Sequence, residues 1–177
     1  MLPYQRIDSR ILKIASVILF AFLLSSFPAM DVKAQGPAPD FTLPDLSGNM
    51  VSLKDFRGNV VFLDFWATWC WPCRKSLPQL VKLDGKYRDK GLVILGLSID
   101  DPDHYDTKYV ADFAESYKVK YRVLRADQKT IAAYLGTENV VVPSLIIINR
   151  DGMIVEKHEG FDLEKVEKVL TKLLENQ

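Results

Sequence analysis

The sequence predicts an α/β domain with a mixed central sheet. Two nearly continuous apolar runs, "VVFLDFW" (60–66) and "LVILGLSI" (92–99), are typical of strands that are covered on both faces. A helical pattern lies between them, and a strand–helix–strand unit of this length implies a right-handed crossover and a parallel pair. Further on, "SLIIINRDGMIVEKHEG" predicts two strands that turn back at residues 149–152. Parallel and antiparallel pairs in one sheet make it mixed.

The remaining elements follow from the same kind of pattern. "DFTLPDLSGNMVSL" alternates apolar and polar residues around positions 47–49, which predicts an N-terminal hairpin. A helix and a short strand (121–124) are expected as an insertion after the second long strand, and "DQKTIAAYLG" predicts a helix that ends at Gly136. Asp162 is expected to cap the last helix. Three helices are expected to have an apolar face. In the first helix it is formed by Leu77, Leu80, Val81 and Tyr87, and in the second by Val110, Phe113, Ala114 and Tyr117. In the last helix it is formed by Leu163, Val166, Val169, Leu170, Leu173 and Leu174.

The first 34 residues differ in composition from the rest of the chain. Arg6, Arg10 and Lys13 precede an apolar run at residues 14–27, and "VKA" (32–34) gives a small-residue cleavage pattern before Gln35. This order describes a secretory signal peptide. The alternative is an uncleaved membrane anchor formed by residues 14–27, although fourteen residues are short for a span of about 20. Both interpretations place the domain at 35–177 outside the cytoplasm, in the periplasm or on the outer face of the cytoplasmic membrane, with "GPAP" (36–39) as a short tether.

The charge of the chain excludes one class of partner. Removing the four basic and two acidic residues of 1–34 leaves 19 Lys and Arg against 21 Asp and Glu. A net charge of −2 argues against nucleic acid, whose binding usually needs a basic face.

The only two cysteines, Cys70 and Cys73, are three positions apart. Exported proteins that use cysteines for stability usually have several well-separated bridges, and a bridge across two residues closes too small a loop to stabilise much. One cysteine pair supplies two of the four ligands of a closed zinc site, and the two histidines are isolated. We therefore expect no metal and no cofactor, and redox chemistry at the cysteine pair.

The position of the pair in the predicted fold suits that chemistry. Cys70 falls where the helix begins after the strand, so unpaired N–H groups and the helix dipole favour its thiolate. The thiolate is the species that attacks a disulfide. Cys73, one turn later on the same face, is placed to resolve the mixed disulfide. Pro72 suits a first helical turn, whereas Pro78 is expected to kink the helix.

Asp64 interrupts the apolar strand that leads to the cysteines. A buried carboxylate is costly, so desolvation is expected to raise its pKa toward neutrality. Such a group is able to accept and return a proton as Cys73 attacks or leaves. The alternative is that Asp64 points to a polar edge or pairs with a lysine.

"DFWATWCWPCRKSLP" resembles the active-site segment of the thioredoxin superfamily. The hairpin region and residues 100–140 resemble the exported TlpA/ResA-like branch of that superfamily, so the similarity covers about residues 37 to 175. It implies a thioredoxin fold with Cys70 as nucleophile and Cys73 as resolving thiol. It also implies that Val142 and Pro143 form the cis-proline loop opposite the cysteines, where the backbone at Val142 pairs with substrate.

The sequence also departs from that branch. Many of its members carry a glutamate three residues after the second cysteine, where this chain has Ser76. Trp71, between the cysteines, is either an exposed aromatic or a contact for partners. Trp66 and Trp69 are expected to pack around the site. Arg74 and Lys75 are expected either to help the thiolate or to lie on a solvated helix face, and "DDPDHYD" (100–106) to be a plain loop.

Taken together, these features predict an exported thiol–disulfide oxidoreductase that works as a reductase. The resemblance implies protein substrates such as apocytochrome c and re-reduction by a membrane dithiol donor. One alternative is a thiol peroxidase on the same fold, which is expected to have a threonine three residues before its reactive cysteine; position 67 is alanine. The other is a non-enzymatic chaperone or assembly module that uses the same groove only for binding.

Overall fold

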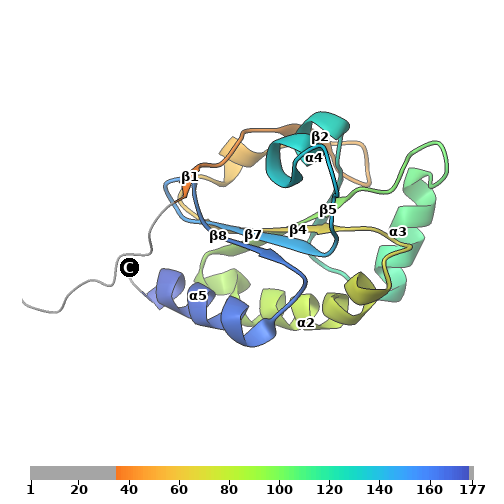
Figure 1. Ribbon diagram of the computed structural model, residues 1–177. Helices are drawn as coiled ribbons and strands as arrows, with labels where there is room; N and C mark the ends of the chain where they lie inside the picture. Colours follow the sequence, from red (N-terminus) through yellow and green to blue (C-terminus); the bar gives the residue numbers. More distant parts are fainter. Residues whose placement is uncertain (1–34, 176–177) are drawn as a thin grey trace, which may run out of the picture. The chain divides into compact units, whose positions relative to one another are not determined.

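A six-stranded mixed sheet forms the centre of the domain, and Figure 1 shows it in a computed structural model that describes residues 35–175. The strand order is β1-β8-β7-β4-β5-β6. The strands are β1 (Gly36–Pro37), β4 (Val60–Trp66), β5 (Leu92–Ser98), β6 (Arg122–Arg125), β7 (Ser144–Ile148) and β8 (Met153–Glu159). Strands β4, β5 and β6 are parallel, whereas β7 runs antiparallel to both β4 and β8. The mixed sheet is the one that the sequence predicts.

Helices cover the sheet on both faces (Figure 1). On one face lie α2 (Trp71–Tyr87), α3 (Thr107–Ser116) and α5 (Leu163–Glu175). The other face carries α4 (Gln128–Leu135) together with the two-stranded hairpin β2 (Thr42–Pro44) and β3 (Met50–Ser52). Two short 3-10 helices, η1 (Leu53–Phe56) and η2 (Arg88–Lys90), follow β3 and α2. The expected N-terminal hairpin and the inserted helix and strand, α3 and β6, are confirmed.

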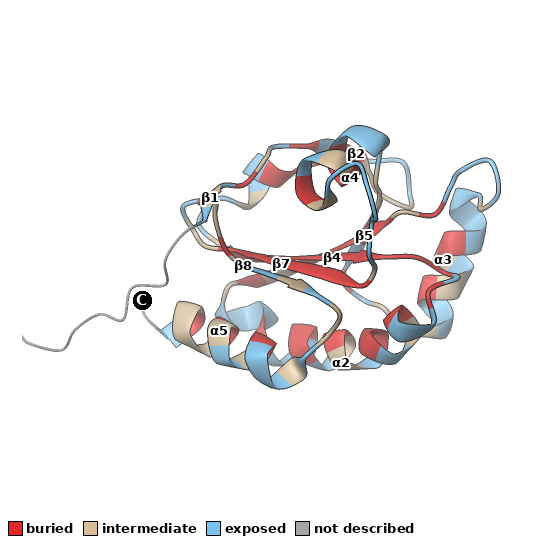
Figure 2. Cartoon of the chain, viewed as in Figure 1, coloured by how far each residue is buried: buried red, intermediate tan, exposed pale blue. Residues whose placement is uncertain are grey.

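All seven residues of strand β4 are buried (Figure 2). Its side chains alternate between the two faces, as in any strand. Phe65 packs against Tyr134 of α4, with ring centroids 5.6 Å apart. The next residue, Trp66, stacks on Phe113 of α3 at 5.7 Å. The apolar run in the sequence therefore reflects burial on both faces, and the carboxyl end of β4 is fixed on each side.

The helix boundaries follow local signals in the sequence. Asp106 and Asp127 cap α3 and α4 by accepting backbone N–H bonds from Tyr109 and Thr130. Gly136, at φ +86°, ends α4 as expected. Helix α2 runs to Tyr87 through Pro78.

The predicted tether at 36–39 is wrong. Gly36 and Pro37 form β1, which pairs antiparallel with Ile154 and Met153 of β8 and extends the sheet at this edge. The following Ala38 is buried and belongs to the main apolar core. The chain is therefore integrated into the domain from its first described residues onward.

The proposed signal peptide or anchor at 1–34, with its apolar run at 14–27, lies outside the described residues. Among residues 35–175, no helix has the length and apolar character needed to cross a membrane.

Candidate active site

The two cysteines lie where β4 passes into α2. Strand β4 ends at Trp66, residues 67–69 form the turn, and Cys70 is the residue that caps α2. Its sulfur accepts the backbone N–H of Cys73 at 3.2 Å. Pro72 occupies the first turn, where a missing N–H leaves no bond unmade. The predicted position of Cys70 at the helix start is confirmed.

Cys70 and Cys73 form a disulfide with their Cα atoms 5.3 Å apart. Cys70 keeps 4% of its surface exposed and Cys73 keeps none. The difference has the expected direction, although both residues are buried. When the bond is reduced, a thiolate at Cys70 receives the N–H groups and the dipole of the helix start, which lower a cysteine pKa.

The loop before β7 approaches the disulfide from another part of the chain. The Val142 carbonyl oxygen lies 3.5 Å from the Cys70 sulfur, and the Val142–Pro143 peptide bond is cis, as the sequence resemblance implies. A disulfide sulfur carries no hydrogen, so this distance is a contact; a reduced Cys70 thiol would be able to donate to the same oxygen. Pro143 is buried, while Val140 and Val141 are exposed beside it. Residues 72 positions apart in sequence thus meet at the sulfur.

Asp64 is completely buried in the middle of β4. It lies opposite Gly96 of β5 and Leu145 of β7, and neither of its carboxylate oxygens has a hydrogen-bond partner among the described residues. Desolvation raises the pKa of Asp64 to about 7. Because side chains two apart on a strand share a face, Asp64 points to the same side as Trp66, the side that α2 covers. The predicted burial and raised pKa are confirmed; a polar edge or a lysine partner is not observed.

Two charged side chains, Asp100 and Arg74, hold the turn before Cys70. The Asp100 carboxylate accepts the backbone N–H of Thr68 at 3.0 and 3.1 Å and the Thr68 hydroxyl at 2.7 Å. Arg74 donates two bonds, at 3.0 and 2.8 Å, to the Thr68 carbonyl oxygen. Arg74 therefore binds the turn backbone, a role that differs from both expected ones. Asp100, expected in a plain loop, is a buried part of the site.

The aromatic residues around the cysteines differ in exposure. Trp66 is buried as predicted, but Trp69 is 52% exposed, so its expected packing role is wrong. Trp69 is the one residue of the 67–69 turn that is exposed to solvent. Trp71 is 63% exposed, with the Lys75 ammonium 5.5 Å from its ring centroid. Pro72 is exposed beside it. The surface next to the disulfide therefore carries three exposed ring side chains, Trp69, Trp71 and Pro72, that a partner protein is able to contact.

Ser76 stands in the position where the resemblance leads one to expect a glutamate. It is buried, and its hydroxyl donates to the Cys73 carbonyl oxygen at 2.9 Å. A hydroxyl bonded within its own helix exchanges no proton with the thiols near neutral pH. Asp64, six residues before Cys70, remains the candidate for proton exchange with the thiols.

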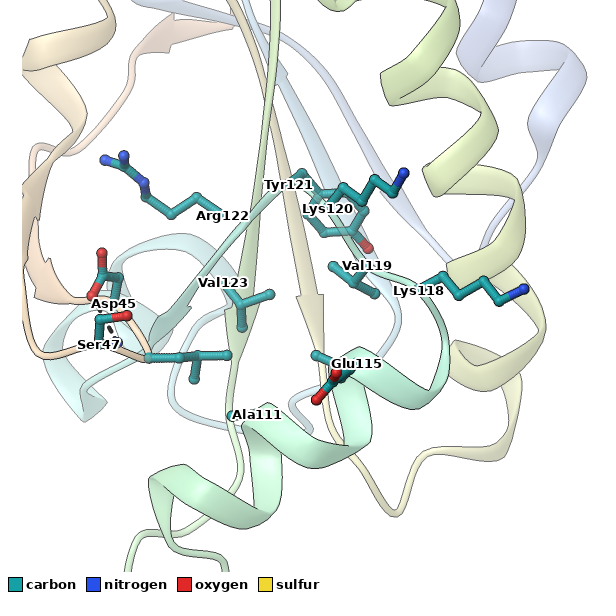
Figure 3. Close-up of a pocket in the computed structure, with 12 residues that line it drawn as sticks. Asp45, Ser47, Ala111, Glu115, Lys118, Val119, Lys120, Tyr121, Arg122 and Val123 are labelled. Carbon is teal, nitrogen blue, oxygen red and sulfur yellow. Dashed lines mark hydrogen bonds between the residues drawn. The ribbon is translucent and has the colours of Figure 1, made fainter.

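A cavity of about 560 Å³ lies elsewhere on the domain, between α3, β6 and the loop of the β2–β3 hairpin (Figure 3). Asp45, Glu115, Lys118, Lys120 and Arg122 bring charges of both signs to its wall. Neither cysteine lines it, so it is not part of the disulfide site. Within residues 35–175, no three His, Cys, Asp or Glu side chains gather in a way that would hold a metal ion.

The fold and the disulfide together define a thioredoxin-fold thiol–disulfide oxidoreductase. The chain belongs to the AhpC/TSA family, whose model matches residues 34–157. It is 35% identical over 137 residues to the thiol-disulfide oxidoreductase ResA of Bacillus thuringiensis subsp. konkukian, covering 77% of this chain and 76% of that protein. It is 37% identical over 123 residues to the thioredoxin-like protein YneN of Bacillus subtilis, with 70% and 69% covered. The resemblance to ResA-like proteins in the sequence is thereby confirmed.

Solved structures agree with this assignment. The thioredoxin domain of a thiol-disulfide oxidoreductase from Bacteroides vulgatus superposes with a TM-score of 0.66 at 31% identity, covering 78% of this chain and 99% of that one. A thiol:disulfide interchange protein from Bacteroides sp. gives a TM-score of 0.65 at 32% identity, with 80% and 93% covered.

Proposed function

We propose that this protein is an exported reductase of protein disulfides, with Cys70 as the nucleophile and Cys73 as the resolving thiol. The observation that carries the proposal is the position of the Cys70 sulfur at the start of α2, 3.2 Å from the Cys73 N–H and 3.5 Å from the Val142 carbonyl oxygen. The contact with the Cys73 N–H favours a thiolate at Cys70. The contact with Val142 places next to the Cys70 sulfur a stretch of backbone that would bind a substrate peptide.

The proposed reaction starts from the reduced pair. The Cys70 thiolate attacks one sulfur of a substrate disulfide, forming a mixed disulfide while the other substrate sulfur leaves as a thiolate. Cys73 then loses its proton and attacks the Cys70 sulfur. The second substrate thiolate leaves, and the Cys70–Cys73 disulfide remains. Two electrons pass to the substrate, and a membrane dithiol donor returns them to the protein.

Asp64 is proposed as the group that takes the proton from Cys73. It lies on the face of the sheet that α2 covers, and its pKa of about 7 makes gain and loss of a proton nearly equal in free energy at neutral pH. In the reverse direction the same carboxyl returns the proton. Cys73 is fully buried, so a proton acceptor inside the protein serves it better than bulk water.

The proposed substrate surface surrounds the disulfide. The backbone at Val142, next to the cis Pro143, would pair with an extended substrate chain, as the resemblance implies. Trp71 and Pro72 are exposed on the helix side and would contact substrate side chains. A substrate with apolar residues near its disulfide fits this surface, because binding then buries Trp71.

The proposed compartment and substrates follow from the N-terminal pattern and from the resemblance. We place the protein in the periplasm or on the outer face of the cytoplasmic membrane, with residues 1–34 removed as a signal peptide or kept as an anchor through 14–27. Apocytochrome c, whose haem-attachment cysteines must be reduced during cytochrome c biogenesis, is the proposed substrate, with other oxidised exported proteins as further ones. N-terminal sequencing of the exported protein is expected to begin at or near Gln35. An intact Met1 indicates the anchor, and a cytoplasmic location contradicts both forms.

Trapping of substrates tests the assigned roles. In cells, Cys73→Ser is expected to accumulate mixed disulfides with partner proteins, because nothing releases them from Cys70. Cys70→Ser is the matched control and is expected to trap few. Equal trapping by the two variants would overturn the assignment. If the double serine variant keeps full function in cells, the protein works as a binding module; rapid peroxide consumption would instead support the peroxidase alternative.

A further inference from the structure

Charged side chains hold the backbone of the turn that precedes the nucleophile. Residues 67–69 join β4 to α2, and Trp69, next to Cys70, is 52% exposed. The one backbone bond that closes the turn runs from the Cys70 N–H to the Ala67 carbonyl oxygen at 3.1 Å. Thr68 lies in the centre of this turn and is 1% exposed. Its two peptide groups therefore decide where Cys70 sits.

Both of those peptide groups are bound by ionic groups. The Asp100 carboxylate takes the Thr68 N–H and hydroxyl, with the hydroxyl bond at 2.7 Å. The Arg74 guanidinium takes the Thr68 carbonyl oxygen. Hydrogen bonds to charged groups are about twice as strong as neutral ones. Such bonds fix both peptide groups of Thr68, although the next residue, Trp69, is exposed.

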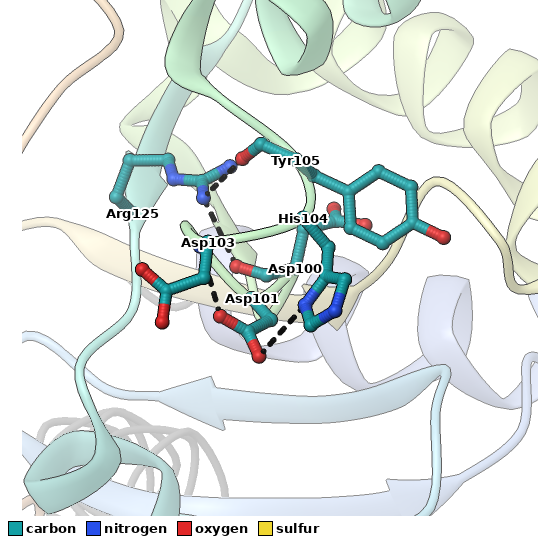
Figure 4. Close-up of polar contacts among 6 residues, drawn as sticks. All are labelled: Asp100, Asp101, Asp103, His104, Tyr105 and Arg125. Carbon is teal, nitrogen blue, oxygen red and sulfur yellow. Dashed lines mark hydrogen bonds and ion pairs between the residues drawn. The ribbon is translucent and has the colours of Figure 1, made fainter.

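Asp100 is itself fixed from behind. Its carboxylate accepts the Ser98 hydroxyl at 2.9 Å. The Arg125 guanidinium donates to the backbone carbonyl oxygens of Asp100 and Tyr105, at 3.0 and 2.9 Å (Figure 4). Asp100 is 3% exposed, whereas Asp101, Asp103 and His104, in the same loop, are exposed. The loop after β5 therefore presents one acid inward, with its direction set by Arg125.

We propose that Asp100 is a positioning residue for the reaction at Cys70. It acts through Thr68: by holding the turn, it keeps the Cys70 sulfur at the start of α2 and against the Val142 carbonyl oxygen. The inference rests on the proposed role of Cys70 as nucleophile. Burying a carboxylate costs desolvation free energy, and replacing a buried charged pair by apolar side chains often leaves a protein at least as stable. Stability alone therefore does not explain a buried carboxylate at this turn. Supporting side chains that orient a reactive group justify that expense.

Four variants separate positioning from charge and from stability. Asp100→Ala removes every bond to Thr68. Asp100→Asn removes the charge but keeps an oxygen that is able to accept the Thr68 N–H. Asp103→Ala removes an exposed acid of the same loop and serves as the control. Thr68→Val deletes the hydroxyl while keeping the backbone N–H, and it gives a milder test if Asp100→Ala does not fold.

Two reactions are measured. The first is the reduction of insulin disulfides, and the second, in a Cys73→Ser background, is the reaction of Cys70 with iodoacetamide as a function of pH. Each variant is used only if its near-UV circular dichroism spectrum is native. We expect Asp100→Ala to slow both reactions by about 10- to 100-fold, as small displacements of a reacting group do, and to move the alkylation profile to higher pH. Asp100→Asn is expected to recover most of the rate, Thr68→Val to lie between, and Asp103→Ala to match the wild type.

The outcomes are distinguishable. A folded Asp100→Ala protein with lower stability but wild-type rates and alkylation profile would show that Asp100 only stabilises the fold. A profile that moves to lower pH would show that the charge of Asp100, and not the turn, dominates at Cys70. An inactive wild-type protein in the insulin assay would instead contradict the proposed function itself.

Discussion

Replacing Asp64 by Asn tests two consequences of burying this acid, its effect on the stability of the fold and its proposed role in proton transfer. The substitution keeps nearly the same volume and removes only the ionisable proton. In the folded protein, burial raises the pKa of Asp64 to about 7, whereas the ordinary value is 3.8. Between these values the folded state holds a proton that the unfolded state has released. Each rise in pH through this window therefore favours unfolding, and the wild-type protein loses stability until the pH reaches about 7.

The size of the loss follows from the shift. A difference of about three pKa units corresponds to a free energy of about 4 kcal/mol, at 1.36 kcal/mol per unit. Asp64→Asn does not ionise, so it avoids this loss. We expect it to be more stable than the wild type by up to about 4 kcal/mol above pH 7. The difference is expected to shrink as the pH falls and to vanish below about pH 3, where the wild-type carboxyl is protonated in both states.

Urea unfolding at pH 4, 6 and 8, with the disulfide intact, measures this difference. Asp103→Asn is the control, because Asp103 is exposed and its substitution is expected to leave stability nearly unchanged at each pH. A stability gain that does not depend on pH would refute the reasoning, since it would mean that the wild-type carboxyl is not titrating between its folded and unfolded values.

The same variant tests the proton transfer. Asn is unable to accept the proton of Cys73, so turnover near neutral pH is expected to fall, on the order of 10²-fold at most. Higher stability together with lower turnover is the combination that the proposal requires. Raised stability with unchanged turnover would leave Asp64 as a buried acid without a role in the reaction, and Cys73 would then exchange its proton by another route.

Three further outcomes follow from the packing. Gly96→Ala is expected to destabilise the fold by about 1–3 kcal/mol in urea unfolding, because the new Cβ would lie 3.0 Å from the Trp66 ring nitrogen. Gly85→Ala, in α2 with no heavy atom within 4 Å of its new Cβ, is expected to stabilise by about 0.5–1 kcal/mol. Trp71→Ala is expected to leave stability within about 0.5 kcal/mol of wild type, because Trp71 is 63% exposed. The same variant is expected to raise KM for an apolar disulfide substrate; an unchanged KM would remove Trp71 from the substrate surface.

The sequence predicts the parts of the structure that depend on local pattern. The apolar runs of β4 and β5 identify two central strands, because burial on both faces leaves no polar positions. The position of Cys70 at the helix start follows from the end of the apolar strand pattern near Trp66 and the beginning of the helical pattern around Leu77. Asp64 is recognisable because a single acid inside such a run is expected to be buried.

Other features depend on contacts between distant residues, and the sequence does not predict them. Strand β1 is two residues long, and its pairing with β8 exists only because the fold brings Met153 and Ile154 to that edge. Asp100 reaches Thr68 across 32 positions, and its neighbours in "DDPDHYD" are acids that face solvent. The one available signal was its place directly behind a buried strand, where loops carry functional side chains. Likewise, the exposure of Trp69 depends on how the turn is oriented.

Asp100 and Asp64, the two buried acids near the disulfide, have opposite surroundings and therefore suit different roles. Asp100 receives hydrogen bonds from Thr68 and Ser98, so its negative charge is satisfied and its position is fixed. Asp64 receives none, and its pKa of about 7 leaves it poised between its two protonation states. A group that must hold geometry needs the first environment, and a group that must exchange a proton needs the second. Without its hydrogen bonds, Asp100 would no longer fix the Thr68 peptide groups, and with such bonds Asp64 would lose the desolvated environment that raises its pKa.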